Sequence, residues 1–178
     1  LGLEPGGALG LAALIPMRIK GQLRACFWPM YRGLVDLTRR SGQVSTVYAY
    51  AVREKDTFKY HLGLNPDIEH QPFEGERGEL KAVYAVGKLR DGGHQFIVMF
   101  ANEVEAIRKR SPSVKAGQTS PWDTDAEQMW LKTAIKRLCK LMPVSSEYRV
   151  AAKLDDQAQQ GIPQDFTVNI DFSEVEPS

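Results

Sequence analysis

Two groups of basic side chains in this sequence have the spacing needed to bind a row of phosphate groups. The first is Arg39-Arg40, which lies in the last turn of a short helix expected over residues 31–42, where the helix dipole favours cations. The second lies on one side of a longer helix expected over residues 123–143 and consists of Lys132, Lys136, Arg137 and Lys140. No acidic residue follows Glu127 in this helix. Cations in a line neutralise the backbone of a nucleic acid, so the sequence favours phosphate binding.

Several further residues are weaker candidates for the same surface. They are Arg90, Arg108, Arg110, Lys115, Tyr31 and Trp122. The two aromatic residues stand beside cations and close to Gly or Pro, so they can stack on bases. The alternative for the basic residues is an ordinary solvated helix face, and the alternative for each aromatic residue is packing in the core.

A metal-dependent nuclease is a rival interpretation of one stretch. Pro66-Asp67 followed by Glu79-Leu80-Lys81 imitates a signature in which two carboxylates hold Mg²⁺ and a lysine stabilises charge at the attacked phosphate. A single Glu-x-Lys arises easily by chance in a chain of which 25% is charged. The three histidines are scattered and no cysteine lies near them, so no metal site is expected. No Gly-rich phosphate loop is present, and no ATP site is expected.

Charge divides the chain into a body and a tail. The 178 residues, 43% of them apolar, are enough for one globular core. All 23 Lys and Arg lie in residues 1–153, whereas residues 154–178 hold six acids and no base. We therefore expect a folded body over residues 1–153 and an acidic tail over residues 154–178. A basic body with an acidic tail suits a polyanion binder, although a solvated tail on an ordinary domain has the same composition.

Other features of the composition bear on location and redox state. No run approaches the ~20 apolar residues of a membrane span, and no signal peptide is recognisable, so a soluble cytoplasmic protein is expected. Cys26 and Cys139 are expected to be reduced and packed. The chain opens on Leu1 instead of Met, so we expect that an N-terminal segment is missing.

Alternating apolar residues separated by turn-forming residues predict three β-hairpins. Their expected strands pair residues 8–16 with 22–28, 44–52 with 58–64, and 80–89 with 95–100. Residues 65–78 are expected to form a loop, and residues 102–110 a helix that Asn102 and Glu105 cap. The predicted fold is α+β, with antiparallel β-hairpins forming a sheet crossed by helices.

The acidic tail contains one segment with strand-like alternation. Phe166, Val168, Ile170 and Phe172 alternate with polar residues. This segment is expected to add as a strand to a sheet edge of its own or of a neighbouring protomer, or to recruit a partner protein such as an exonuclease.

The order of several motifs resembles the RecT family of phage and prophage single-strand annealing proteins. The resemblance covers about residues 1–146 and is carried by residues 1–10, Tyr31-Arg32-Gly33 with the rest of 31–42, residues 89–93, 95–99, 115–117, 121–124, 132–138 and 141–145. It implies a recombinase of a bacterial host cell that binds single-stranded DNA and anneals complementary strands without ATP and without covalent chemistry.

The same resemblance implies a homo-oligomer, either a ring or a helical filament, with DNA in a basic groove that runs along it. It also implies the RecT/Redβ-like mixed fold of antiparallel sheet crossed by helices. No cofactor is expected, with Mg²⁺ at most an aid to annealing. The alternative that stays open is a module that coats nucleic acid without annealing it.

Overall fold

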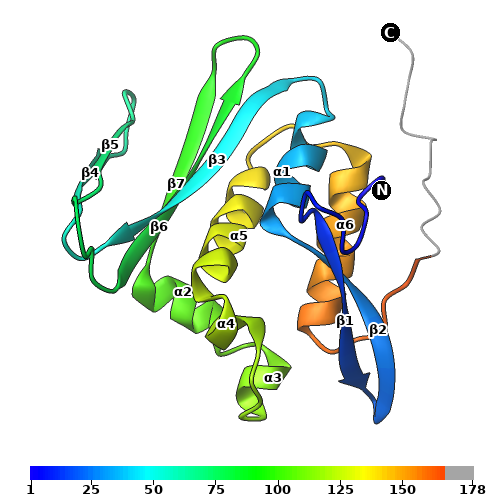
Figure 1. Ribbon diagram of the computed structural model, residues 1–178. Coiled ribbons are helices and arrows are strands. Elements are labelled where there is room, and N and C mark those ends of the chain that lie inside the picture. The colour runs from blue at the N-terminus through cyan, green and yellow to red at the C-terminus, as the bar shows by residue number, and fades with distance from the viewer. Residues whose placement is uncertain (167–178) are drawn as a thin grey trace, which may run out of the picture.

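The computed structural model describes residues 1–166, which form an α+β fold with antiparallel sheets (Figure 1). Its largest sheet has the strand order β3 (Val44–Arg53), β6 (Leu80–Leu89) and β7 (His94–Phe100). Helix α5 (Ala126–Cys139) packs against one face of this sheet and contacts all three strands. The α+β prediction is confirmed.

The predicted hairpin β6–β7 is confirmed. The two strands pair antiparallel from Ala82 opposite Phe100 to Lys88 opposite His94. In the turn, Gly92 has a positive φ of 93°, which glycine adopts without steric strain. The N–H of Leu89 donates to the carbonyl of Gly93 at 2.7 Å and closes the turn.

The predicted hairpin of residues 44–52 with 58–64 is wrong in its pairing. Strand β3 pairs with β6 instead, whereas β4 (Thr57–His61) pairs with β5 (Asp67–Gln71) in a separate two-stranded sheet. Strand β5 lies in the stretch that was expected to be a loop. Asp56, in the turn after β3, explains the parting of the strands, because its carboxylate is held by groups of β5 and of the segment that follows β5.

The buried carboxylate of Asp56 accepts five hydrogen bonds. Arg77 donates from Nε at 2.9 Å and from Nη2 at 2.6 Å, and His70 Nε2 lies at 3.1 Å. The backbone N–H groups of Arg53 and Phe73 donate at 2.8 and 3.0 Å. These bonds fasten both ends of the β4–β5 hairpin to the end of β3.

The predicted N-terminal hairpin is confirmed, with its first strand shifted toward the turn and its second strand one residue longer than expected. Strands β1 (Ala12–Ile19) and β2 (Gln22–Pro29) pair antiparallel. The expected five-residue turn contracts to Lys20-Gly21, whose φ angles of 49° and 79° are those of a tight hairpin turn.

Helix α1 (Tyr31–Arg39) follows β2 directly, and Gly42 with a φ of 75° ends the turn after it, as predicted. Gly33 explains the Tyr-Arg-Gly motif, because a Cβ at this position would lie 2.1 Å from the carbonyl oxygen of Leu11. The helix therefore touches the backbone that leads into β1.

The remaining helices differ in part from the prediction. Helix α2 (Ala101–Arg108) begins one residue early and is capped by Glu103, which accepts from the N–H of Phe100 at 3.1 Å, and not by the Asn102 and Glu105 pair. The expected helix over residues 123–143 is divided into α4 (Pro121–Thr124) and α5, and the short helix α3 (Pro112–Lys115) precedes them.

Helix α6 (Ser146–Gln159) was not predicted. The expected boundary between residues 153 and 154 falls inside it, so Asp155 and Asp156 belong to the folded body. The expectation of strand addition by the tail concerns Phe166, Val168, Ile170 and Phe172, of which only Phe166 lies within the described residues.

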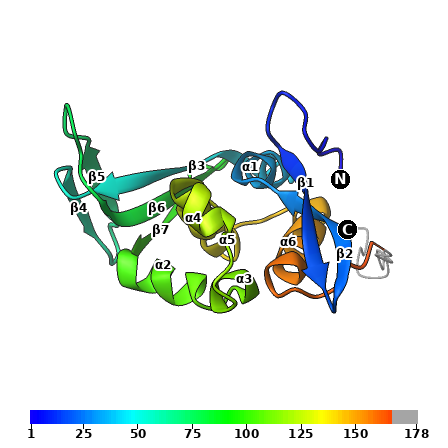
Figure 2. The ribbon, with the colours of Figure 1, turned by 60° about the horizontal axis from the view of Figure 1, so that its bottom comes forward.

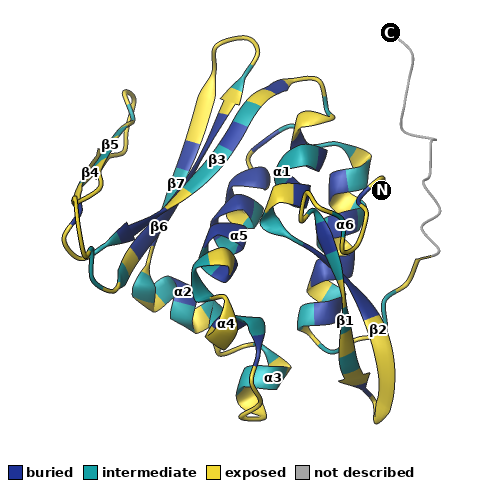
Figure 3. Ribbon diagram, viewed as in Figure 1, coloured by how far each residue is buried: buried dark blue, intermediate teal, exposed yellow. Residues whose placement is uncertain are grey.

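The main core lies between α1, α5, α6, the β1–β2 hairpin and one face of the large sheet (Figure 3). Its side chains without solvent exposure include Leu34, Leu37, Ile135 and Leu138. Cys26 and Cys139 are both unpaired and buried, and burial raises the pKa of each thiol.

Candidate nucleic-acid interface

The predicted basic stripe on α5 meets an acidic residue of α6 in the protein interior. Asp155 is fully buried, and its carboxylate forms ion pairs with Lys132 and with Lys136, the latter at 2.6 Å. The ammonium group of Lys132 also lies 4.5 Å from the ring centroid of Trp28. Lys132 was predicted to contact phosphate, but it is only 3% exposed, so its ammonium group is not open to a phosphate in this structure.

Opposing effects set the pKa values in this cluster. Burial lowers the pKa of Lys132 to about 8, although Asp155 favours its charged form. For Lys136 burial works against the ammonium, but the carboxylates of Asp155 and Asp156 together raise its pKa. Burial likewise disfavours the Asp155 anion, yet the two lysines hold the pKa of this carboxyl below its usual value. The cluster thus keeps charge inside the α5–α6 contact by mutual pairing.

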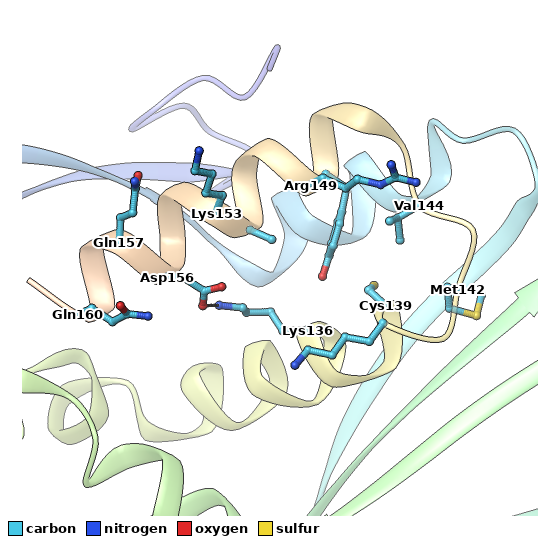
Figure 4. Close-up of a pocket in the computed structure, with 12 residues that line it drawn as sticks. Lys136, Cys139, Met142, Val144, Arg149, Lys153, Asp156, Gln157 and Gln160 are labelled. Atoms are coloured by element: carbon cyan, nitrogen blue, oxygen red, sulfur yellow. Dashed lines mark hydrogen bonds and ion pairs between the residues drawn. The ribbon is translucent and has the colours of Figure 1, made fainter. Parts of the chain in front are cut away.

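Two hollows border the outer side of this cluster. One, of about 590 Å³, lies between α5 and α6 (Figure 4). The other, of about 470 Å³, lies between α2, α5 and α6. They share Lys136, Lys140 and Asp156 in their linings. Together they form one surface, which we call the basic groove.

The basic groove carries more positive than negative side chains. Its cations are Arg110, Lys136, Arg137, Lys140, Arg149 and Lys153, and its acids are Glu103 and Asp156. The two acids are engaged, because Lys136 pairs with Asp156 at 2.6 Å and Arg137 with Glu103 at 2.7 Å. Arg137 and the N–H of Phe100 hold the pKa of Glu103 below its usual value. Figure 4 shows Lys136 and Asp156 meeting across the space between the helices.

Four groove cations stay outside these pairs. Arg110, Lys140, Arg149 and Lys153 are exposed and form no ion pair within the part of the chain that the structure describes. Arg149 and Lys153 were missed by the sequence reasoning, since α6 was not recognised. Two features of the sequence could have indicated this helix. Ser145 is a helix-capping residue, and its hydroxyl accepts from the N–H of Tyr148 at 3.2 Å. Arg149 and Lys153 are four residues apart, which places them on one face of the helix that follows.

The first predicted cation pair, Arg39-Arg40, lies at the end of α1. This end of α1 adjoins the start of α6, because the Ser145 hydroxyl donates to the carbonyl of Leu37 at 2.9 Å. Arg39 is exposed. Arg40 instead pairs with Asp36 at 2.6 Å and donates to the carbonyl of Leu1 at 2.7 Å.

The other predicted residues are placed apart from the groove lining. Arg90 lies in the β6–β7 turn and Lys115 at the end of α3, both exposed. Arg108 pairs with Glu105 and, at 2.8 Å, with Asp123. Trp122 is 5% exposed and packs in the core, which leaves its ring unavailable for stacking in this structure, whereas Tyr31 is half-buried.

Two further observations concern a metal site and a membrane span. Across residues 1–166 no three His, Cys, Asp or Glu side chains gather closely enough to hold a metal ion, and this range includes Asp67 and Glu79. In the same range no helix has the length and apolar character needed to cross a membrane.

Comparison with known proteins agrees with the order of motifs in the sequence. The pattern that describes the RecT family matches residues 1–169. The chain belongs to the RecT family. It is 45% identical to Protein RecT of Escherichia coli strain K12 over 161 residues, which are 88% of this chain and 59% of that protein.

A second relative is more distant. The chain is 29% identical to the uncharacterized protein YqaK of Bacillus subtilis strain 168 over 177 residues, which are 96% of this chain and 57% of that protein. The chain thus spans less than two thirds of the length of the curated relatives it matches.

Proposed function

We propose that this protein binds single-stranded DNA and anneals complementary strands without ATP, as a recombination protein of the phage or prophage type. The observation that carries the proposal is the basic groove between α2, α5 and α6, with six cations against two acids. Membership of the RecT family supports the same activity.

The mechanism uses no covalent chemistry. Arg110, Lys140, Arg149 and Lys153 contact backbone phosphates of a first strand, and Arg39 extends this row from the end of α1. Phosphate contacts leave the base edges free, so a second strand can sample registers until enough base pairs form. Each correct step contributes ~1.4 kcal/mol on average, and annealing therefore requires no nucleotide hydrolysis.

Lys136 and Arg137 can join the phosphate contacts by exchanging partners. Each pairs with a carboxylate at the rim of the groove, Asp156 or Glu103. A phosphate that replaces this carboxylate can accept the same charge-assisted hydrogen bond from the cation. Lys132 has a structural role in this proposal, because its ammonium is enclosed between Asp155 and Trp28.

Assembly is part of the proposal. About five phosphate contacts on one protomer bind a single strand weakly at physiological salt, so grooves of several protomers act together along one strand. The proposed oligomer is a ring or a helical filament. We also propose that residues 165–172 recruit an exonuclease and that the protein acts in the cytoplasm. Mg²⁺ acts at most as an aid to annealing.

Two measurements test the proposal. Titration of a fluorescent oligonucleotide should give a log affinity that falls with log salt at a slope of roughly −3.5, about −0.7 for each of the five phosphates contacted by Arg39 and the four groove cations. A slope near zero would exclude the phosphate groove. Mixing of two labelled strands should then show faster duplex formation with the protein than without it, in EDTA and without ATP.

The same mixing assay separates the rival functions. A module that only coats nucleic acid would bind both strands and leave the rate of duplex formation unchanged or slower. A metal-dependent nuclease would shorten the labelled strand when Mg²⁺ is added, and intact strands after prolonged incubation would exclude it.

A further inference from the structure

Two hairpins lie at opposite ends of the molecule, as both views of the ribbon show (Figures 1 and 2). The β1–β2 hairpin stands beyond α6 at one end, and the β4–β5 hairpin stands beyond the large sheet at the other. Each is a two-stranded sheet that pairs with no other strand among residues 1–166. The side chain of Gln164 already bonds to the N–H and the carbonyl of Phe27 in β2. The edges to which another chain can add are therefore those of β1 and of the β4–β5 hairpin.

The hairpin β1–β2 is basic and partly apolar on its surface. Residues 12–29 contain Arg18, Lys20 and Arg24 and no acid. Leu14 and Leu23 are 58% and 70% exposed. Leu23 lies directly across from Arg18 in the strand register, so an apolar and a charged side chain share one face. We call residues 12–29 the basic hairpin.

The opposite end has the complementary character. Residues 54–79, which include β4 and β5, contain seven acids against three Lys and Arg. The buried Asp56 and Arg77 pair with each other, which leaves six acids against two lysines. Leu64 is fully exposed, Leu62 is 69% exposed and Phe73 is 48% exposed. We call residues 54–79 the acidic wing. Large exposed apolar side chains beside charges mark surfaces that bind partners.

We propose that the acidic wing of one copy docks on the basic hairpin of the next copy. The inference rests on the assembly proposed above and names the surfaces that carry it. Because the two surfaces differ and lie at opposite ends, the contact is head-to-tail, and its repetition produces a ring or a filament. The negative charge of the acidic wing repels nucleic acid, so DNA is not a partner for both surfaces. A second copy of this chain is complementary to both, because it carries a basic hairpin and an acidic wing.

Charge reversal tests the contact. Arg18→Glu with Arg24→Glu makes both ends acidic, and Glu74→Lys with Glu76→Lys adds positive charge to the wing of a second variant. These four side chains are exposed, and none forms an ion pair in the described structure. Each variant alone should associate more than about tenfold less strongly than the unchanged chain in sedimentation velocity at low salt. An equimolar mixture of the two should recover association, because each supplies the surface that the other has lost.

Lys88→Glu with Lys109→Glu is the matched control for the reversal of Arg18 and Arg24, since it changes the net charge of the chain by the same amount and sign at exposed positions outside both surfaces. Its association should equal that of the unchanged chain. The inference is overturned if the unchanged chain is monomeric at all concentrations, if either variant alone keeps its association, or if the mixture stays monomeric.

Binding of a short oligonucleotide, measured in parallel, keeps this result distinct from the proposed function. The reversal of Glu74 and Glu76 should leave this binding no weaker, since neither residue lines the basic groove. Loss of oligonucleotide binding with intact association in the Arg18 and Arg24 variant would assign the basic hairpin to nucleic acid and overturn the docking inference. Loss of annealing with intact charge-dependent association would count against the proposed function alone.

Discussion

The ammonium group of Lys136 lies 2.6 Å from the carboxylate of Asp155, across the contact between α5 and α6. Asp155→Asn would leave Lys136 and Lys132 facing an uncharged amide in a buried site. We expect the free energy of unfolding to fall by about 3–5 kcal/mol, as is typical when one member of a buried ion pair is lost. Urea denaturation followed by circular dichroism measures this change.

Asp156→Asn is the matched control for that prediction. This neighbouring side chain is 57% exposed and pairs only at the groove surface, also with Lys136. The expected loss is within about 1 kcal/mol. Equal losses for the two variants would contradict the structural role assigned to Asp155. Single-strand affinity should rise in Asp156→Asn, because a negative charge leaves the basic groove.

The exposed cations of α6 should act on binding and not on folding. Arg149→Ala with Lys153→Ala should weaken binding of all single-stranded sequences alike and reduce the salt slope by roughly 1.4, about 0.7 for each lost contact. The midpoint of thermal unfolding should stay nearly unchanged. Lys109→Ala, an exposed lysine outside the groove lining, should change neither quantity. An unaltered salt slope in the double variant would remove Arg149 and Lys153 from the interface.

Gly33 should tolerate no side chain, because its neighbour is backbone. A Cβ would lie 2.1 Å from the carbonyl oxygen of Leu11, so Gly33→Ala must displace α1 or the segment before β1. We expect a loss of about 1–3 kcal/mol in a thermal or urea denaturation. At Gly87 the Cβ would instead meet the flexible end of Met142 at 2.5 Å, and Gly87→Ala should cost less. The opposite order would contradict the packing of α1 described above.

Asp56 should make the protein sensitive to acid. The pKa of this carboxyl lies well below its usual value, although burial alone would raise it. The largest cause is the hydrogen bonding by Arg77, to which two backbone N–H groups and His70 add. An Asp titrates near ~3.9 in the unfolded chain. The stability from Asp56 is therefore fully present above about pH 5 and is lost as the pH falls below that unfolded value.

Asp56→Asn tests this assignment. The variant should be less stable at pH 7 by about 3 kcal/mol or more. It should also lose less stability than the unchanged chain when urea denaturation is repeated between pH 5 and pH 2. Asp67→Asn, at an exposed acid of β5, should keep the pH dependence of the unchanged chain.

Local signals in the sequence predicted the elements with neighbouring partners. The turn Arg90-Asp91-Gly92-Gly93 identified β6–β7, and Gly42 marked the end after α1. Strand β3 was predicted as a strand but paired wrongly, because its partner β6 lies beyond the β4–β5 hairpin in the chain. Alternation along one strand indicates which face is buried and carries no information about which strand lies beside it.

Helix α6 escaped prediction because its inner face is weakly apolar. The buried positions are Tyr148, Ala151, Leu154, Asp155 and Ala158. Two small alanines and a carboxylate interrupt the apolar period that identifies an amphipathic helix. The same omission left the α5 cations without apparent partners in the sequence and hid Arg149 and Lys153. The family was recognisable from linear motifs, whereas the composition of the groove depended on this helix.

The burial of both thiols makes the protein suitable for attachment of a single fluorescent dye. Cys26 and Cys139, the two cysteines of the sequence, are 2% and 3% exposed, and burial raises the pKa of each. Maleimide reagents attack thiolates that solvent can reach, so both native cysteines should react slowly in the folded chain. A cysteine introduced at Lys109 would then be the preferred attachment point without removal of either native residue. Energy transfer between dyes on the protein and on a DNA strand would follow the approach of the strand to α2 and its neighbouring helices in real time.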